Sequence, residues 1–128
     1  MRQSARQTIL LFLLGEGASF VLAALVHAGV LTHGYEHRQA AIAESTIGLV
    51  LLAGLGLAWA WPARDRLIGL IAQGFALLGT LVGLFTIAVG IGPRTVPDLV
   101  YHGAILVTLA WGLVVAARAP AERARQLA

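Results

Sequence analysis

The sequence contains no cysteine and no lysine. Without cysteine, the chain has no structural disulfide, no thiolate metal site, no iron–sulfur cluster and no c-type haem attachment. The net charge of +3 does not predict nucleic-acid binding, because the nine arginines stand near the ends of apolar segments rather than along one face. No nucleophile elbow, phosphate loop or nucleotide fingerprint is present either. The sequence therefore favours a non-enzymatic role, although it leaves the question open.

Apolar residues make up 59% of the 128 residues and gather in four long segments. A helix needs about 20 apolar residues to cross a bilayer, and a backbone in hydrocarbon must satisfy its own hydrogen bonds. We therefore expect an all-α integral membrane protein in which residues 1–128 form one transmembrane domain. The expected spans are residues 8–31, 40–61, 67–92 and 97–117.

The arginines also predict the orientation of these spans. Arginine-rich loops favour the cytoplasmic side, and the loops are short enough to make successive helices antiparallel. We expect a four-helix up-down-up-down bundle in the inner (plasma) membrane, with both termini cytoplasmic. Motifs of small residues such as Gly79-x-x-x-Gly83 allow close helix packing, which fits a homo-oligomer or a subunit of a larger membrane complex. Seven arginines fall on the cytoplasmic side in this arrangement (2, 6, 64, 66, 118, 123 and 125), and two fall outside (38 and 94).

Three polar residues from three different spans stand at a similar depth on the outer side. His27, Glu44 and His102 are each expected about 5–6 Å below the outer interface. Charged groups in a span cost about 2.5–3.5 kcal/mol at its centre and usually face the bundle interior. We therefore predict a buried His/Glu site that opens to the extracytoplasmic side.

Additional histidines extend this predicted site. If the second helix begins near Thr32, His33-x-x-x-His37 and Glu44 lie along one helical stripe, and Asp98 shares a face with His102. Imidazole and carboxylate groups suit copper, zinc or iron. The leading hypothesis is a transition metal held by His27, Glu44, His102, His33 and His37, or a b-type haem with His27 and His102 as axial ligands. Such a site would serve electron transfer, metal handling or a redox complex. Solvated or packing histidines, a proton relay, and a quinone or lipid-headgroup site are the alternatives.

A second polar pair is expected deeper in the membrane. Glu16 lies about 12 Å from the cytoplasmic end of the first span, and Gln73 stands at a comparable depth in the third. This pair fits a proton relay or a coupling site, and it also fits a hydrogen bond that only joins helices. Two alternatives follow for the function: a small proton-coupled transporter that uses Glu16, or a structural accessory subunit.

The size, the four spans and the glutamate in the first span resemble the small multidrug resistance transporters in architecture. That resemblance implies exchange of protons for cations at Glu16. The sequence Leu14-Gly15-Glu16-Gly17-Ala18 departs from the first-helix pattern of that family, and no lysine follows it in the span. The resemblance therefore covers the architecture alone.

Overall fold

The computed structural model describes residues 2–121 of the chain, and within that range it contains helices and no strand. Four of these helices are long and apolar enough to cross a membrane, as expected from the sequence. A short 3₁₀ turn, η1 (Pro62–Arg64), joins the second and third helices. The helices are α1 (Arg2–His27), α2 (Arg38–Ala60), α3 (Asp65–Ala88) and α4 (Val96–Arg118).

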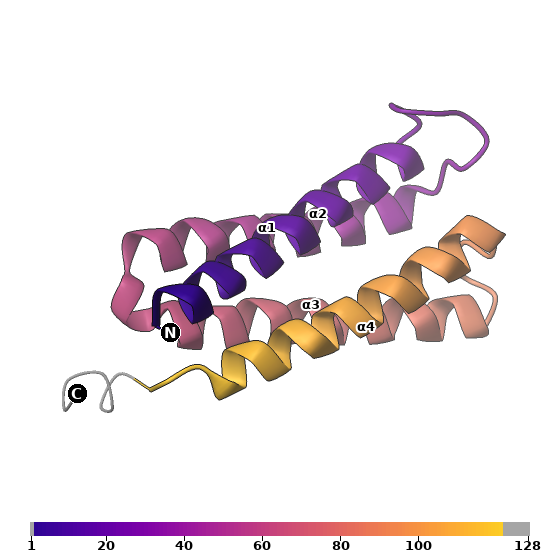
Figure 1. Cartoon of the computed structure of the whole chain (residues 1–128). Coiled ribbons are helices and arrows are strands. Elements are labelled where there is room, and N and C mark those ends of the chain that lie inside the picture. The colour runs from indigo at the N-terminus through magenta and orange to yellow at the C-terminus, as the bar shows by residue number, and fades with distance from the viewer. Residues whose placement is uncertain (1, 122–128) are drawn as a thin grey trace.

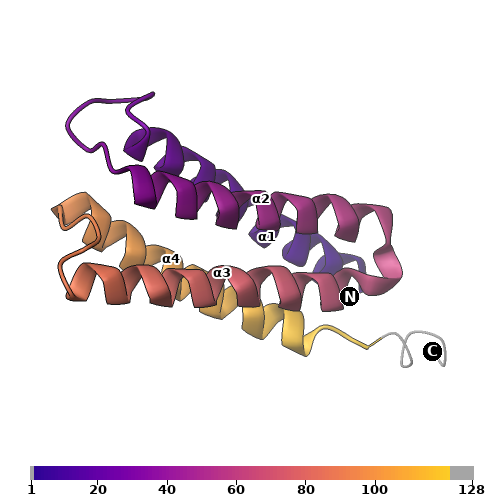
Figure 2. The same cartoon turned by 180° about the vertical axis from the view of Figure 1, so that it is seen from behind.

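The four helices pack lengthwise into a bundle (Figure 1). Seen from both sides, α1 lies with α2 and α3 lies with α4, and the α1–α2 and α3–α4 connections share one end of the bundle (Figure 2). The start of α1, η1 and the end of α4 lie at the other end. Each helix contributes a fully buried residue to the core: Leu13, Leu51, Ala76 and Leu109. Most other large apolar side chains point outward, as they do in a bundle surrounded by lipid.

Two helices end earlier than expected, and a glycine follows each end. α1 stops at His27 rather than near residue 31, and Gly29 takes the left-handed conformation with φ +73°. α3 stops at Ala88 rather than near residue 92, and Gly90 has φ +85°. Glycine pays no steric penalty for a positive φ and is the common residue just beyond a helix end. The apolar residues that follow each glycine extended the predicted spans beyond the true helices.

The expected start of α2 near Thr32 is wrong. The helix begins at Arg38, and the side chain of His37 caps it by accepting a hydrogen bond from the backbone N–H of Ala40 at 3.2 Å. The backbone N–H of His37 donates to the carbonyl oxygen of His27 at 2.9 Å, which returns the loop to the end of α1. His33 and His37 therefore do not share a helical face, because residues 28–37 are not helical.

The start of α4 agrees with the sequence, since Pro97 occupies the first turn. Thr95 is the N-cap and forms a capping box with Asp98, in which each side chain bonds the backbone N–H of the other residue. This box fixes the carboxylate of Asp98 at the end of the bundle where α1 stops and α2 begins.

Candidate functional site

The side chain of His27, the last residue of α1, lies between two carboxylates from two other helices. Its Nδ1 is 2.7 Å from Oε2 of Glu44 on α2, and its Nε2 is 2.9 Å from Oδ1 of Asp98 on α4. All three side chains are buried. One imidazole therefore joins α1, α2 and α4 at the same end of the bundle. We call His27, Glu44 and Asp98 the outer triad.

The two carboxylates of the outer triad differ in how completely they are hydrogen-bonded. Oδ2 of Asp98 accepts from the backbone N–H of Thr95 at 3.0 Å and from the Thr95 hydroxyl, while Oδ1 faces His27. Glu44 bonds only through Oε2, and its buried Oε1 has no hydrogen-bond partner. Asp98 is thus held as an ionised acceptor, whereas Glu44 keeps one oxygen free.

This difference determines how the triad holds its protons. The two hydrogen bonds that Oδ2 of Asp98 accepts from Thr95 stabilise the ionised carboxylate, and an ionised Asp98 requires Nε2 of His27 to carry the hydrogen between them. The remaining proton is shared between Nδ1 of His27 and Oε2 of Glu44. It sits either on a neutral glutamic acid or on a doubly protonated imidazole, so the two groups titrate as a pair.

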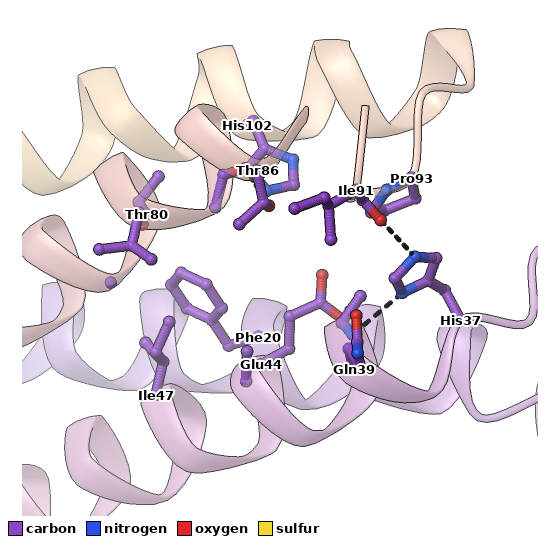
Figure 3. Close-up of a pocket in the computed structure, with 16 residues that line it drawn as sticks. Phe20, His37, Gln39, Glu44, Ile47, Thr80, Thr86, Ile91, Pro93 and His102 are labelled. Atoms are coloured by element: carbon purple, nitrogen blue, oxygen red, sulfur yellow. Dashed lines mark hydrogen bonds between the residues drawn. The ribbon is translucent and has the colours of Figure 1, made fainter. Parts of the chain in front are cut away.

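A cavity of about 140 Å³ is lined in part by Glu44. Figure 3 shows the Glu44 carboxyl group pointing into this space from α2, with His102 on the opposite side and Phe20 beside it. Several lining residues, including Val82 and Ile91, are also exposed on the outer surface of the bundle, so the cavity reaches that surface. We call this cavity the outer pocket. Its polar lining residues are His37, Gln39, Glu44, Thr80, Thr86 and His102.

His102 presents a free ring nitrogen to the outer pocket. Its Nδ1 is 2.7 Å from the backbone oxygen of Asp98, which can only accept, so Nδ1 carries the hydrogen. Nε2 of a neutral His102 is therefore an acceptor. A Cβ atom placed on Gly83 would lie 3.2 Å from this nitrogen, so only the smallest residue at position 83 leaves it unobstructed. Two residues that line the pocket thus carry an acceptor atom without a protein donor, Glu44 at Oε1 and His102 at Nε2.

The other predicted ligands occupy different positions. His37 lines the pocket, but Nδ1 accepts from Ala40 and Nε2 donates to the Ile91 carbonyl oxygen at 3.2 Å. His33 is exposed in the loop, where Nδ1 is 3.1 Å from Oε1 of Glu36. Within residues 4–121, no group of three or more His, Cys, Asp or Glu side chains is arranged to hold a metal ion. Of the five predicted metal ligands, only Glu44 and His102 both line the pocket and have a lone-pair atom without a hydrogen-bond partner.

Glu36 is the only acidic residue of that loop, which spans residues 28–37, and its carboxyl group is hydrogen-bonded. Its own backbone N–H and that of Gly34, at 2.7 Å from Oε2, hold the pKa of the Glu36 carboxyl below its usual value. The contact with His33 adds to this lowering. These bonds fold the exposed loop between α1 and α2 without contributing an atom to the outer pocket.

Asp98 has a more central place than the sequence predicted. We expected it only as part of an outer shell, and the structure makes it one of the two carboxylates that hold His27. The signal that could have found it is Thr95-x-x-Asp98 around Pro97, which is the pattern of a helix start. Glu16 and Gln73, the second predicted pair, are both buried where α1, α3 and α4 meet.

No family model, no curated protein and no solved structure matches this chain.

Proposed function

We propose that this protein is a small multi-pass membrane protein that binds a ring-sized, largely apolar molecule in the outer pocket. The molecule donates hydrogen bonds to Glu44 and His102, and phenols and hydroquinones have this chemistry. The observation that carries the proposal is Glu44, which lines the pocket and whose buried Oε1 has no partner in the protein. A buried acceptor without a donor is costly, and a bound hydroxyl group would satisfy it.

The size of the pocket supports this ligand class. An engineered cavity of about 150 Å³ in another protein holds one benzene molecule. The outer pocket, at about 140 Å³, has room for one six-membered ring with small substituents. An apolar tail on such a ring would extend past Val82 and Ile91 toward lipid, because both residues also face outward.

The outer triad supplies a proton-linked response to binding. A hydroxyl group that donates to Oε1 stabilises the ionised form of Glu44, so the shared proton moves toward Nδ1 of His27. Asp98 then faces a positively charged imidazole, which strengthens the bond at Nε2. Binding at the pocket thus shifts a proton within a triad that joins three helices.

The orientation in the membrane belongs to the same proposal. An up-down-up-down bundle with both termini cytoplasmic puts the outer pocket on the extracytoplasmic side of the inner membrane. Arg6 donates to the Trp59 carbonyl oxygen at 3.3 Å, and Arg66 donates to that of Ala117 at 3.2 Å, at the arginine-rich end. Arg94 donates to Ile87 at 2.7 Å at the opposite end. Homo-oligomerisation and membership of a larger complex stay predictions.

A transition metal is the second candidate, because Oε1 of Glu44 and Nε2 of His102 are also metal-ligand atoms. A site of that kind would need further ligands from water or from the bound molecule. His27 has both ring nitrogens committed to carboxylates, so its predicted role as a ligand would require breaking one of those bonds. A haem macrocycle is several times larger than a single six-membered ring, so the dimensions of the pocket do not support the b-type haem prediction.

The proposal is tested with methylhydroquinone and its dimethyl ether, titrated into the purified protein in nanodiscs and followed by calorimetry. Two lost hydrogen bonds at about 0.5–1.5 kcal/mol each should weaken binding of the ether by about 5- to 150-fold. Gly83→Val should abolish binding of methylhydroquinone, because the larger side chain would crowd His102. Gly103→Val is the matched control, since no atom lies within 4 Å of a Cβ at position 103.

Equal affinities for methylhydroquinone and the ether would contradict the proposal, as would binding that Gly83→Val leaves unchanged. Elemental analysis and a visible absorption spectrum of the same sample test the metal and haem predictions. One stoichiometric metal that Glu44→Gln and His102→Ala both remove would favour the second candidate.

A further inference from the structure

A second polar cluster lies in the interior of the bundle, away from the outer pocket. Glu16 on α1 and Gln73 on α3 are almost completely buried, with exposed fractions of 1% and 0%. Gly112 on α4 completes the cluster: a Cβ atom there would overlap Oε1 of Gln73 and lie 2.9 Å from Oε1 of Glu16. The two side-chain oxygens therefore converge on the same point of α4.

All the free atoms of this cluster are hydrogen-bond acceptors. Neither carboxyl oxygen of Glu16 has a partner, and neither does Oε1 of Gln73. The amide nitrogen of Gln73 points away from Glu16, because it donates one of its two hydrogens to the carbonyl oxygen of Gly69 at 3.2 Å, while Oε1 lies on the side of Gly112. If the amide were rotated by 180°, its nitrogen would face Glu16, but Oε1 would then lie against the carbonyl oxygen of Gly69. Two acceptors would still face each other. The cluster lacks one hydrogen between Glu16 and Gln73.

The described neighbours of Glu16 provide no ion-pair partner that could replace this hydrogen. Among the described side chains, no arginine or histidine lies within ion-pair distance of Glu16. The facing elements contribute the amide of Gln73 from α3 and the bare backbone of Gly112 from α4, while Leu51 and Leu52 of α2 pack beside the neighbouring Gly17. An ionised carboxylate without a partner is strongly disfavoured in such an environment.

We propose that Glu16, Gln73 and Gly112 form a proton-binding site, in which Glu16 holds a proton and donates it to Oε1 of Gln73. Loss of that proton leaves two acceptors facing each other in a site with no room for a bridging group beside Gly112. The contact among α1, α3 and α4 must then loosen or admit water. The occupancy of this site by a proton thus sets how closely the three helices pack, independently of any ligand in the outer pocket.

The site is tested by infrared spectroscopy of the whole protein in nanodiscs at neutral pH. The wild type should show the C=O stretch of a protonated carboxylic acid, and Glu16→Gln should remove that band. The variant should fold as well as the wild type, because its amide can donate to Gln73 in place of the acid. Glu44→Gln is the control that identifies any contribution from the outer triad, and the band assigned to Glu16 should survive it.

Gly112→Ala provides a test that does not change any titratable group. Its methyl group would displace Gln73, so the acid band should shift in frequency or disappear. Gly103→Ala, on the same helix and in open space, should leave the band unchanged. An absent band in Glu44→Gln, where only Glu16 can supply it, or a band that persists in the double variant Glu16→Gln/Glu44→Gln, would overturn the proposal. A band that sodium ions remove would assign the site to that cation instead and would equally overturn it.

Discussion

Replacement of His27 by leucine tests whether the outer triad holds the end of the bundle together. The substitution removes the only hydrogen bond of Glu44 and one of the bonds of Asp98, while Asp98 keeps both bonds to Thr95. Leucine is apolar and fits the buried position at the end of α1. We expect the loss of stability to come mainly from Glu44, whose carboxyl group is left buried without any partner.

The magnitude follows from the state that Glu44 can adopt. Breaking a buried ion pair by removing one partner costs about 3–5 kcal/mol when the remaining charge persists. Glu44 can instead take the shared proton, which limits its penalty to that of an unpaired buried polar group, about 1–3 kcal/mol. Single hydrogen bonds measured in membrane proteins average about 0.6 kcal/mol and reach about 1.7 kcal/mol. We therefore expect His27→Leu to lower the free energy of unfolding by about 2 kcal/mol.

The decisive comparison is the double variant His27→Leu/Glu44→Leu. Replacing both partners by apolar groups removes the orphaned carboxyl group, so the double variant should be about 1 kcal/mol more stable than His27→Leu alone. The free energy of unfolding is measured in mixed micelles by circular dichroism as the mole fraction of SDS rises. His33→Leu is the matched control and should have no effect, because the side chain of His33 is 88% exposed. A double variant that loses the sum of the two single effects would refute the reasoning.

Two smaller predictions concern the contact between α2 and α3 and the loop before α2. Gly54→Ala should destabilise the bundle by about 1–3 kcal/mol in the same unfolding assay, because its Cβ would lie 2.8 Å from Cβ of Ala72. Gly56→Ala, two residues away with no atom within 4 Å of its Cβ, should not destabilise it. In an NMR titration, the pKa of Glu36 should lie below the ordinary value of a glutamate, owing to its own backbone N–H, that of Gly34 and the His33 contact. The loop bonds should then persist above the unfolded-state pKa and weaken as pH falls through the lower folded-state pKa, whereas an unshifted pKa would show that these bonds do not form.

The number and approximate extent of the helices could be predicted from the sequence because apolar runs of this length have few other solutions in a membrane. The helix ends could not, because a hydropathy pattern does not report where the backbone turns. Gly29 and Gly90 end α1 and α3 inside the apolar runs. His37 caps α2 through its side chain, which is a less common role than that of the Ser, Thr, Asp and Asn caps used for sequence-based prediction.

The sequence could indicate which polar residues lie near one another at this end of the bundle, but not which of them form hydrogen bonds with each other. Equal depth on three helices correctly brought His27 and Glu44 together, because depth follows from residue count along a helix. It could not show that His27 would use both ring nitrogens for carboxylates, since this depends on how the helices are rotated and on the turn that places Asp98. His33 was assigned to the site from a helical phase that the loop does not have.

The unsatisfied acceptors are the feature on which both proposals rest, because polar residues that only join helices are expected to satisfy one another. In a purely structural role, each costly polar group is expected to find its partner within the protein, as Asp98 does with His27 and Thr95. Glu44 and Glu16 depart from that pattern, because each keeps at least one buried oxygen without a donor. If these positions served only to stabilise the fold, an amide or an apolar residue would stabilise it better than a buried carboxyl group with an unpaired oxygen. Glu44 lines the outer pocket, whereas both carboxyl oxygens of Glu16 are buried beside Gln73 and Gly112, so we propose an external ligand for Glu44 and a proton for Glu16.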